Sequence, residues 1–136
     1  MWLAELDQTQ RSTLLGLAYN VVVSDGLLDP NEERMIGEFR REMALDDAEV
    51  PEYLELEGVE TVFGSWRSRC VAIVNLLMLS YADGAFEIEE ECLLKDVSSR
   101  FAISDRDFLL LDNWVRRYLV LKADAETLFR EPAGPS

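Results

Sequence analysis

The sequence predicts an all-α protein, a compact bundle of about six or seven helices. Three observations lead to this fold class. Apolar residues recur at helical spacing along most of the chain, and no segment alternates between apolar and polar residues as a half-buried strand would. The helical pattern also occurs twice. We therefore expect two helix-turn-helix units related by a pseudo-twofold axis.

The duplication is clearest in two acidic segments, SDGLLDPNEE at residues 24–33 and ADGAFEIEEE at residues 82–91. When the chain is shifted so that Asp25 lies over Asp83, a shift of 58, residues 25–50 align with residues 83–108 without a gap. The identical pairs are Asp25/Asp83, Gly26/Gly84, Glu32/Glu90, Glu33/Glu91, Ala44/Ala102 and Asp47/Asp105. The apolar positions of the two segments also match, which makes an internal repeat credible.

The first unit, about residues 10–50, is predicted to be a helix, a tight turn and a second helix. Its apolar residues recur at helical spacing before the turn (Leu14, Leu17, Ala18, Val21 and Val22) and after it (Met35, Ile36, Phe39 and Met43). Asp29 suits the N-cap of the second helix and Pro30 its first position. The run VVV at 21–23 is strand-like in composition, but no partner strand accompanies it.

The second unit, about residues 68–121, shows the same order of elements. Its apolar residues are Val71, Val74, Leu77, Met78 and Tyr81 before the turn, and Leu93, Leu94, Val97 and Phe101 after it. A further helix is predicted from Ser104, at capping-box spacing from Asp107, to about Leu121.

The remaining segments are predicted to be short or irregular. Residues 46–65, with breaks at Pro51, Gly58 and Gly64, should form a short helix or an irregular stretch. We expect residues 1–130 to form one domain and residues 131–136 a frayed tail.

The charge and composition exclude several classes of function. The chain has 27 acidic and 13 basic residues, which give a formal charge of −14. Because such a charge repels the phosphate backbone, nucleic acid is not an expected partner, and cations or a basic protein are. It has no histidine, which removes Ser-His-Asp and Cys-His catalysis and imidazole zinc sites. A metal-dependent hydrolase with paired carboxylates would also need a nucleophile or a positively charged stabiliser near the turns, and none is present. We therefore predict that the protein is not an enzyme.

The cysteines and the start of the chain favour a cytoplasmic protein. Cys70 and Cys92 form no CxxC motif and are expected to be reduced and buried. The start, MWLAELDQ, has no basic region of the kind that opens an export signal. The longest apolar run, residues 71–82, is too short to span a bilayer. Trp66 and Trp114 are expected to pack in the core or at its rim.

The acidic turns match the second half of an EF-hand calcium loop. With Asp25 at loop position 5, Gly26 takes position 6, Leu28 position 8, Asp29 position 9 and Glu32 position 12. The second turn fits in the same way with Asp83, Gly84, Phe86, Glu87 and Glu90. Loop positions 1 and 3 fall on Val21 and Val23, or on Leu79 and Tyr81, which supply no acidic ligand. The turns are therefore not EF-hands.

The chain contains twice a predicted helix, then the motif (A/S)DG-x-Φ-(D/E)-x-x-E, then a second predicted helix. This pattern resembles that of the TerB-like tellurite-resistance family. The resemblance covers both units and hence most of residues 14–121. It implies an all-helical domain that binds a metal ion and acts in a tellurite or stress-response setting. By position, the family's acidic turn residues are Asp25, Asp29, Glu32, Asp83, Glu87 and Glu90. Since these ligands are all oxygens, Ca²⁺, Mg²⁺ or Mn²⁺ is favoured over Zn²⁺.

Two other interpretations of the acidic turns are open. In one, each Asp-Gly is ordinary turn chemistry and the following carboxylates only cap a helix. In the other, the turns dock a basic protein partner without a metal. Six carboxylates without nearby bases repel one another, and a cation relieves that repulsion. Glu33 and Glu91 are rotated away from Glu32 and Glu90 and are expected to be solvated.

Overall fold

The computed structural model describes residues 1–23, 30–46, 52–82, 88–130 and 132, and within them all regular structure is helical. A short 3-10 turn, η1 (Leu3–Glu5), precedes six α-helices. These are α1 (Gln8–Val22), α2 (Pro30–Glu42), α3 (Val59–Val62), α4 (Trp66–Ala82), α5 (Ile88–Arg100) and α6 (Asp105–Phe129). The predicted all-α fold class is confirmed for this part of the chain.

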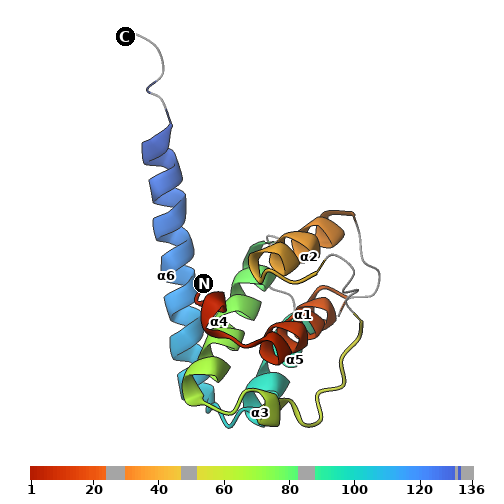
Figure 1. Ribbon diagram of the computed structural model, residues 1–136. Helices are drawn as coiled ribbons and strands as arrows, with labels where there is room; N and C mark the ends of the chain where they lie inside the picture. Colours follow the sequence, from red (N-terminus) through yellow and green to blue (C-terminus); the bar gives the residue numbers. More distant parts are fainter. Residues whose placement is uncertain (24–29, 47–51, 83–87, 131, 133–136) are drawn as a thin grey trace.

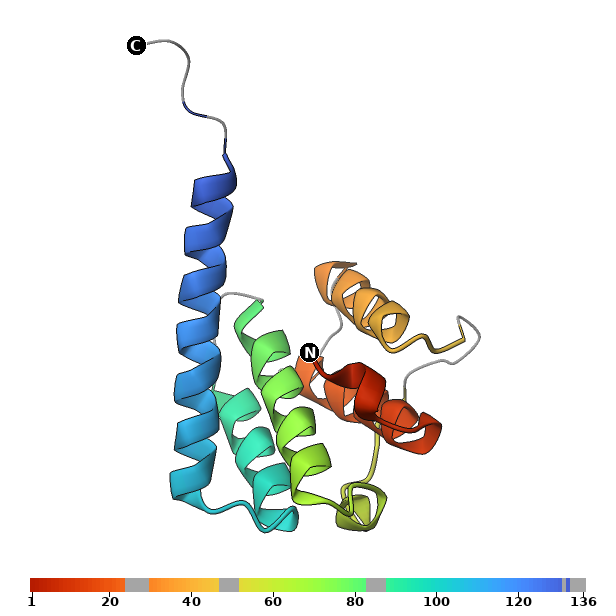
Figure 2. The same ribbon diagram turned by 60° about the vertical axis from the view of Figure 1, so that its left-hand side comes forward.

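Helix α4 is the centre of the bundle, and α1, α5 and α6 all pack against it (Figure 1). Every residue from 71 to 77 is buried, including the amide of Asn75. A helix that is apolar on all sides can only be stable in such a position, because it has no polar face to give to water. Helix α2 packs against α1, and the second half of α6 extends beyond the other helices (Figure 2).

Helices α2 and α5 have the same length and matching ends. Both contain 13 residues, and the starts at Pro30 and Ile88 are 58 positions apart, which is the offset of the sequence repeat. Ala44 and Ala102 follow them in the left-handed conformation, with φ of 54° and 58°. The same backbone bonds close each end: Ala44 N–H to Arg41 O and Leu45 N–H to Arg40 O, and Ala102 N–H to Ser99 O and Ile103 N–H to Ser98 O. The pseudo-twofold relation of the whole units stays a prediction.

Two arginines at equivalent positions hold these helix ends. Arg11 Nη1 donates to the carbonyl of Met43 at 3.1 Å, and Arg69 Nη1 donates to that of Phe101 at 2.9 Å. Each guanidinium also donates to two carbonyls that precede its own helix, those of Leu6 and Ala4 for Arg11 and those of Phe63 and Glu60 for Arg69. Arg11 and Arg69 are again 58 residues apart, the same offset as the two acidic segments.

The segment before α3 is held on α1 by Asn20, a side chain that is only 2% exposed. Its Nδ2 donates to Leu54 O at 2.7 Å, and Leu54 N–H donates to its Oδ1 at 2.9 Å. A Cβ at Gly16 would lie 3.1 Å from Leu54 Cβ, so this glycine allows the close approach. The predicted short helix within 46–65 is confirmed as α3, and Gly58 before it has a φ of 84°.

Helix α6 is longer than the sequence analysis predicted. It begins after Ser104, whose side chain accepts the Asp107 N–H as expected, but it ends at Phe129 instead of about Leu121. Residues 122–129 contain neither Gly nor Pro and include Lys, Ala, Glu and Leu, which favour helix. The predicted tail, residues 131–136, lies outside the described residues apart from Pro132.

Two expectations about burial were wrong. Both cysteines are free thiols, but Cys70 is half-buried and Cys92 is exposed, because Cys92 shares the outer face of α5 with Glu89 and Asp96. Trp66 is 53% exposed, because it is the first residue of α4, and it belongs neither to the core nor to the half-buried residues packed around it. Trp114 is half-buried against the core, as predicted. Among the described residues, no helix combines the length and apolarity needed to cross a membrane.

Candidate functional site

Two of the six predicted metal ligands, Glu32 and Glu90, lie within the described residues. Each is the third residue of its helix, α2 or α5. Glu32 is only 5% exposed and Glu90 is half-buried. The other four predicted ligands, Asp25, Asp29, Asp83 and Glu87, lie outside the described residues.

Glu32 is buried because it takes a core-facing position of α2. It shares one face with Met35, Ile36 and Phe39, at the spacing of successive helical turns. Glu33, rotated by about 100°, is exposed, as the sequence predicted. In α5 the side chain of Glu91 is 42% exposed and pairs with Lys95 at 3.2 Å.

A polar cluster braces the end of α4, which directly precedes the second acidic segment in the sequence. Tyr81 Oη donates to Asp112 Oδ1 of α6 at 2.6 Å, and Arg116 Nε lies 2.9 Å from Tyr81 Oη and 3.1 Å from Asp112 Oδ2. Asp112 is 7% exposed, and these bonds offset the loss of its hydration. The first unit has Val23 at the position of Tyr81, so only the second unit has this brace.

The titration of Tyr81 tests the brace. Burial, followed by the hydrogen bond to the Asp112 carboxylate, raises the pKa of Tyr81 above its ordinary value of 10.0. Because the pKa of Tyr81 is raised in the folded state, the protonated hydroxyl contributes fully to the stability of the fold below about pH 10. This contribution is lost as the pH rises through the folded-state pKa. In an absorbance titration of the 4 tyrosines, we expect one late component that Tyr81→Phe removes. If the component that Tyr81→Phe removes titrates at the ordinary pKa of about 10, with no late component in the wild type, the contact is contradicted.

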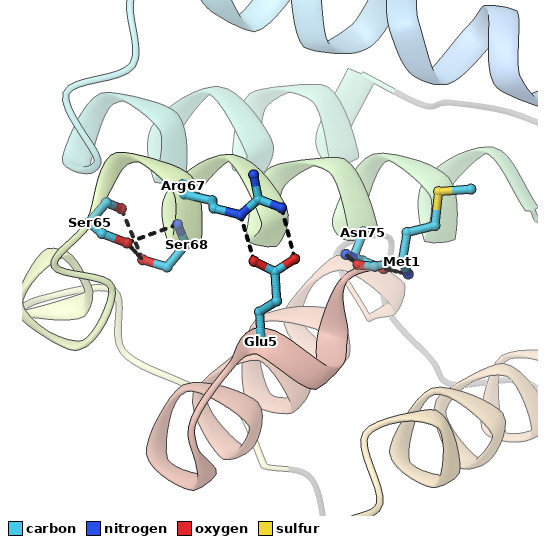
Figure 3. Close-up of polar contacts among 6 residues, drawn as sticks. All are labelled: Met1, Glu5, Ser65, Arg67, Ser68 and Asn75. Atoms are coloured by element: carbon cyan, nitrogen blue, oxygen red, sulfur yellow. Dashed lines mark hydrogen bonds and ion pairs between the residues drawn. The ribbon is translucent and has the colours of Figure 1, made fainter.

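The N-terminal segment is fastened to α4 by polar contacts at Asn75 and Arg67 (Figure 3). The Met1 amino group donates to Asn75 Oδ1, and Asn75 Nδ2 donates to Met1 O, both at 2.9 Å. Arg67 binds Glu5 through two hydrogen bonds of 2.5 and 2.9 Å, which lower the pKa of the Glu5 carboxyl. Ser65 caps α4 by accepting the Ser68 N–H at 3.1 Å. The ring of Trp2 then lies 5.6 Å from that of Trp114.

Two cavities open on the surface near α6. The first, about 330 Å³, lies between α2, α4 and α6, with Glu38, Glu42 and Lys122 among its lining residues. The second, about 300 Å³, is lined mainly by apolar groups, with Arg67 and Cys70 beside them. Its apolar lining consists of Trp2, Val71, Val74, Leu111 and Trp114. Neither cavity is lined by Glu32 or Glu90.

The described residues alone do not assemble a metal centre. Over residues 1–23, 30–46, 52–82, 88–130 and 132, no three Asp, Glu or Cys side chains gather as a metal-binding group. Of the predicted ligands, Glu32 and Glu90 account for one carboxylate each, and the rest lie outside the described residues. Sequence reasoning missed the arginine contacts and the Tyr81 brace. The arginine contacts could have been suspected from the sequence, because Arg11 and Arg69 align under the 58-residue shift.

No protein-family model matches this chain, and comparisons with curated proteins and with solved structures find no match either.

Proposed function

We propose that this protein is a TerB-like helical binding module that holds a divalent cation at its acidic turns, in a tellurite or stress-response setting. The observation that carries the proposal is the burial of Glu32, which is 5% exposed while its neighbour Glu33 is exposed. In the repeated motif, Glu32 and Glu90 occupy the place that ligates calcium at the end of an EF-hand loop.

The chemistry of the motif supports a cation. A buried carboxylate loses hydration, and a cation is one of the groups that can compensate that loss. Asp25 and Asp29 precede Glu32 within seven residues, and the second turn repeats the arrangement with Asp83 and Glu87 before Glu90. Like charges at such spacing repel unless a cation joins them. Oxygen ligands alone suit Ca²⁺, Mg²⁺ or Mn²⁺.

Adjacent glutamates provide a matched pair of variants for a calorimetric titration with each ion. Glu32→Gln and Glu33→Gln remove the same charge one residue apart, so they affect general attraction of cations equally. If Glu32 is a ligand, Glu32→Gln should weaken binding about tenfold or more, a loss of about 1.4 kcal/mol, and Glu33→Gln should change it little. Glu90→Gln and Glu89→Gln form the same pair in the second unit. Equal weakening within each pair would mean that the ions only screen the net charge.

A second candidate is a metal-independent interaction domain that docks a basic protein. The observation that favours it is the cavity of about 330 Å³ between α2, α4 and α6, whose wall contains Glu38 and Glu42 as well as Lys122. Binding of a lysine-rich peptide at this cavity should weaken steeply as NaCl is added, because exposed charges are screened. A chelated cation should mostly survive the same salt. Loss of peptide binding in Glu38→Gln, with ion binding unchanged, would support this candidate.

A further inference from the structure

The second half of α6 has a large apolar surface that no other part of the described chain covers. Leu121 is 66% exposed, Leu128 81% and Phe129 78%. This half extends beyond the bundle (Figure 2). Exposed apolar residues of this size, gathered in one place, are typical of an interaction surface.

These residues continue a regular stripe along α6. The stripe consists of Leu111, Trp114, Tyr118, Leu121, Ala125 and Leu128, at alternating intervals of three and four residues. This is the spacing of the contact positions of paired helices. Its first three residues are half-buried at the bundle, whereas Leu121 and Leu128 are exposed.

The apolar cavity lies at the opposite end of the same stripe. It measures about 300 Å³ and is lined by Leu111 and Trp114 of α6, by Val71 and Val74 of α4, and by Trp2. Trp2 is itself 44% exposed. Each molecule therefore carries a protruding apolar end and, on the same helix, a partly open apolar cavity.

We propose that α6 pairs antiparallel with α6 of a second copy of this chain. The stripe is symmetric about the midpoint between Leu119 and Val120, so all six residues find a counterpart. Tyr118 faces the partner's Leu121, Trp114 faces the partner's Ala125, and Leu111 faces the partner's Leu128. The end of each α6, with Leu128 and Phe129, then enters the apolar cavity of the other copy. The contact is the same on both molecules, as a twofold dimer requires.

The distribution of charge favours a second copy at this place. A chain with a net charge of −14 repels itself, but α6 from Asp112 to Phe129 has three acidic and three basic residues. Beside the stripe, Arg117 faces the partner's Asp124 in the antiparallel arrangement. In a parallel arrangement Arg117 would face the partner's Lys122, which is repulsive.

Analytical ultracentrifugation of the full chain tests the dimer and the face that forms it. Leu121→Asp lies on the stripe, and Val120→Asp, at a residue that is 61% exposed, lies on another face of the same helix. We expect a dimer whose dissociation constant rises about tenfold or more in Leu121→Asp and changes little in Val120→Asp. A wild type that stays monomeric at all concentrations overturns the proposal, and so does equal weakening by the two variants.

The orientation of the helices is tested by charge reversal. In the antiparallel pair, Arg117→Glu should weaken the dimer, and adding Asp124→Arg should restore it. In a parallel pair, Arg117→Glu would face the partner's Lys122 and tighten the dimer instead. A tighter dimer in Arg117→Glu therefore overturns the antiparallel arrangement.

The two free cysteines report on the cavity. Cys70 lines it, and Cys92 is exposed on α5. Alkylation of Cys70, followed by mass spectrometry, should slow as the protein concentration rises, whereas alkylation of Cys92 should keep its rate. Leu121→Asp should abolish the concentration dependence at Cys70. A constant Cys70 rate in a wild type that dimerises would show that the cavity is not part of the interface.

Discussion

Replacing Arg69 by methionine is expected to lower the free energy of unfolding by about 3 kcal/mol. The guanidinium of Arg69 donates to three backbone carbonyls, those of Phe63 at 2.5 Å, Phe101 at 2.9 Å and Glu60 at 2.9 Å. It also lies over the Phe101 ring, 5.8 Å from its centre. Methionine keeps much of the apolar packing of the side chain and removes all three donors, so the carbonyls at the end of α5 and around α3 lose their partner. Urea unfolding followed by circular dichroism measures the loss.

Arg11→Met is the matched control, because it removes the equivalent contact in the other half of the chain. Its bonds to Leu6, Met43 and Ala4 are longer, at 3.0, 3.1 and 3.2 Å, and the last is exposed. We expect a smaller loss of about 2 kcal/mol. A loss of less than about 0.5 kcal/mol for Arg69→Met, the range of ordinary surface substitutions, would show that the guanidinium does not hold the helix ends together.

Addition of the cation that the acidic turns are proposed to bind is expected to raise the free energy of unfolding by about 2.7 kcal/mol. This value applies when the ion is present at one hundred times its dissociation constant. For a domain of this size that corresponds to a rise in the melting temperature of roughly 10 °C relative to chelator. Each turn lacks the first two acidic ligands of an EF-hand, so water or the other turn must complete the shell and the affinity should be modest. Millimolar Ca²⁺, Mg²⁺ or Mn²⁺ is therefore the range to use in the thermal melt.

Variants of the acidic turns separate a site from general screening of the net charge. Asp25→Asn and Asp83→Asn should reduce the rise in melting temperature, whereas Glu33→Gln, at an exposed position, should leave it nearly unchanged. NaCl at equal ionic strength serves as the reference for screening. If the wild type and every variant respond alike to each ion, the cation site does not exist and the acidic segments act only as turns and caps.

The helices of this protein were determined by local sequence. Pro30 begins α2, and Ser104 caps α6, because the residue types at helix starts depend on backbone groups only a few positions away. The repeated spacing of apolar residues predicted α1, α2, α4 and α5, and with them the all-α fold. For the candidate site, the sequence separated Glu32 from Glu33 correctly, because adjacent helical residues cannot share a face.

Only the tertiary structure decided which surfaces are covered and which distant groups meet. The Tyr81–Asp112 bond joins residues 31 positions apart, and Arg69 reaches the carbonyl of Phe101, 32 positions away. Such pairs depend on how α4 lies against α5 and α6, which no local pattern specifies. Exposure of Cys92 and of the end of α6 has the same origin, because burial depends on whether a neighbouring element is there to cover a face. The length of α6 depends on local helix propensity. Whether its apolar stripe is covered depends on the other helices, and these end before α6 does (Figure 2).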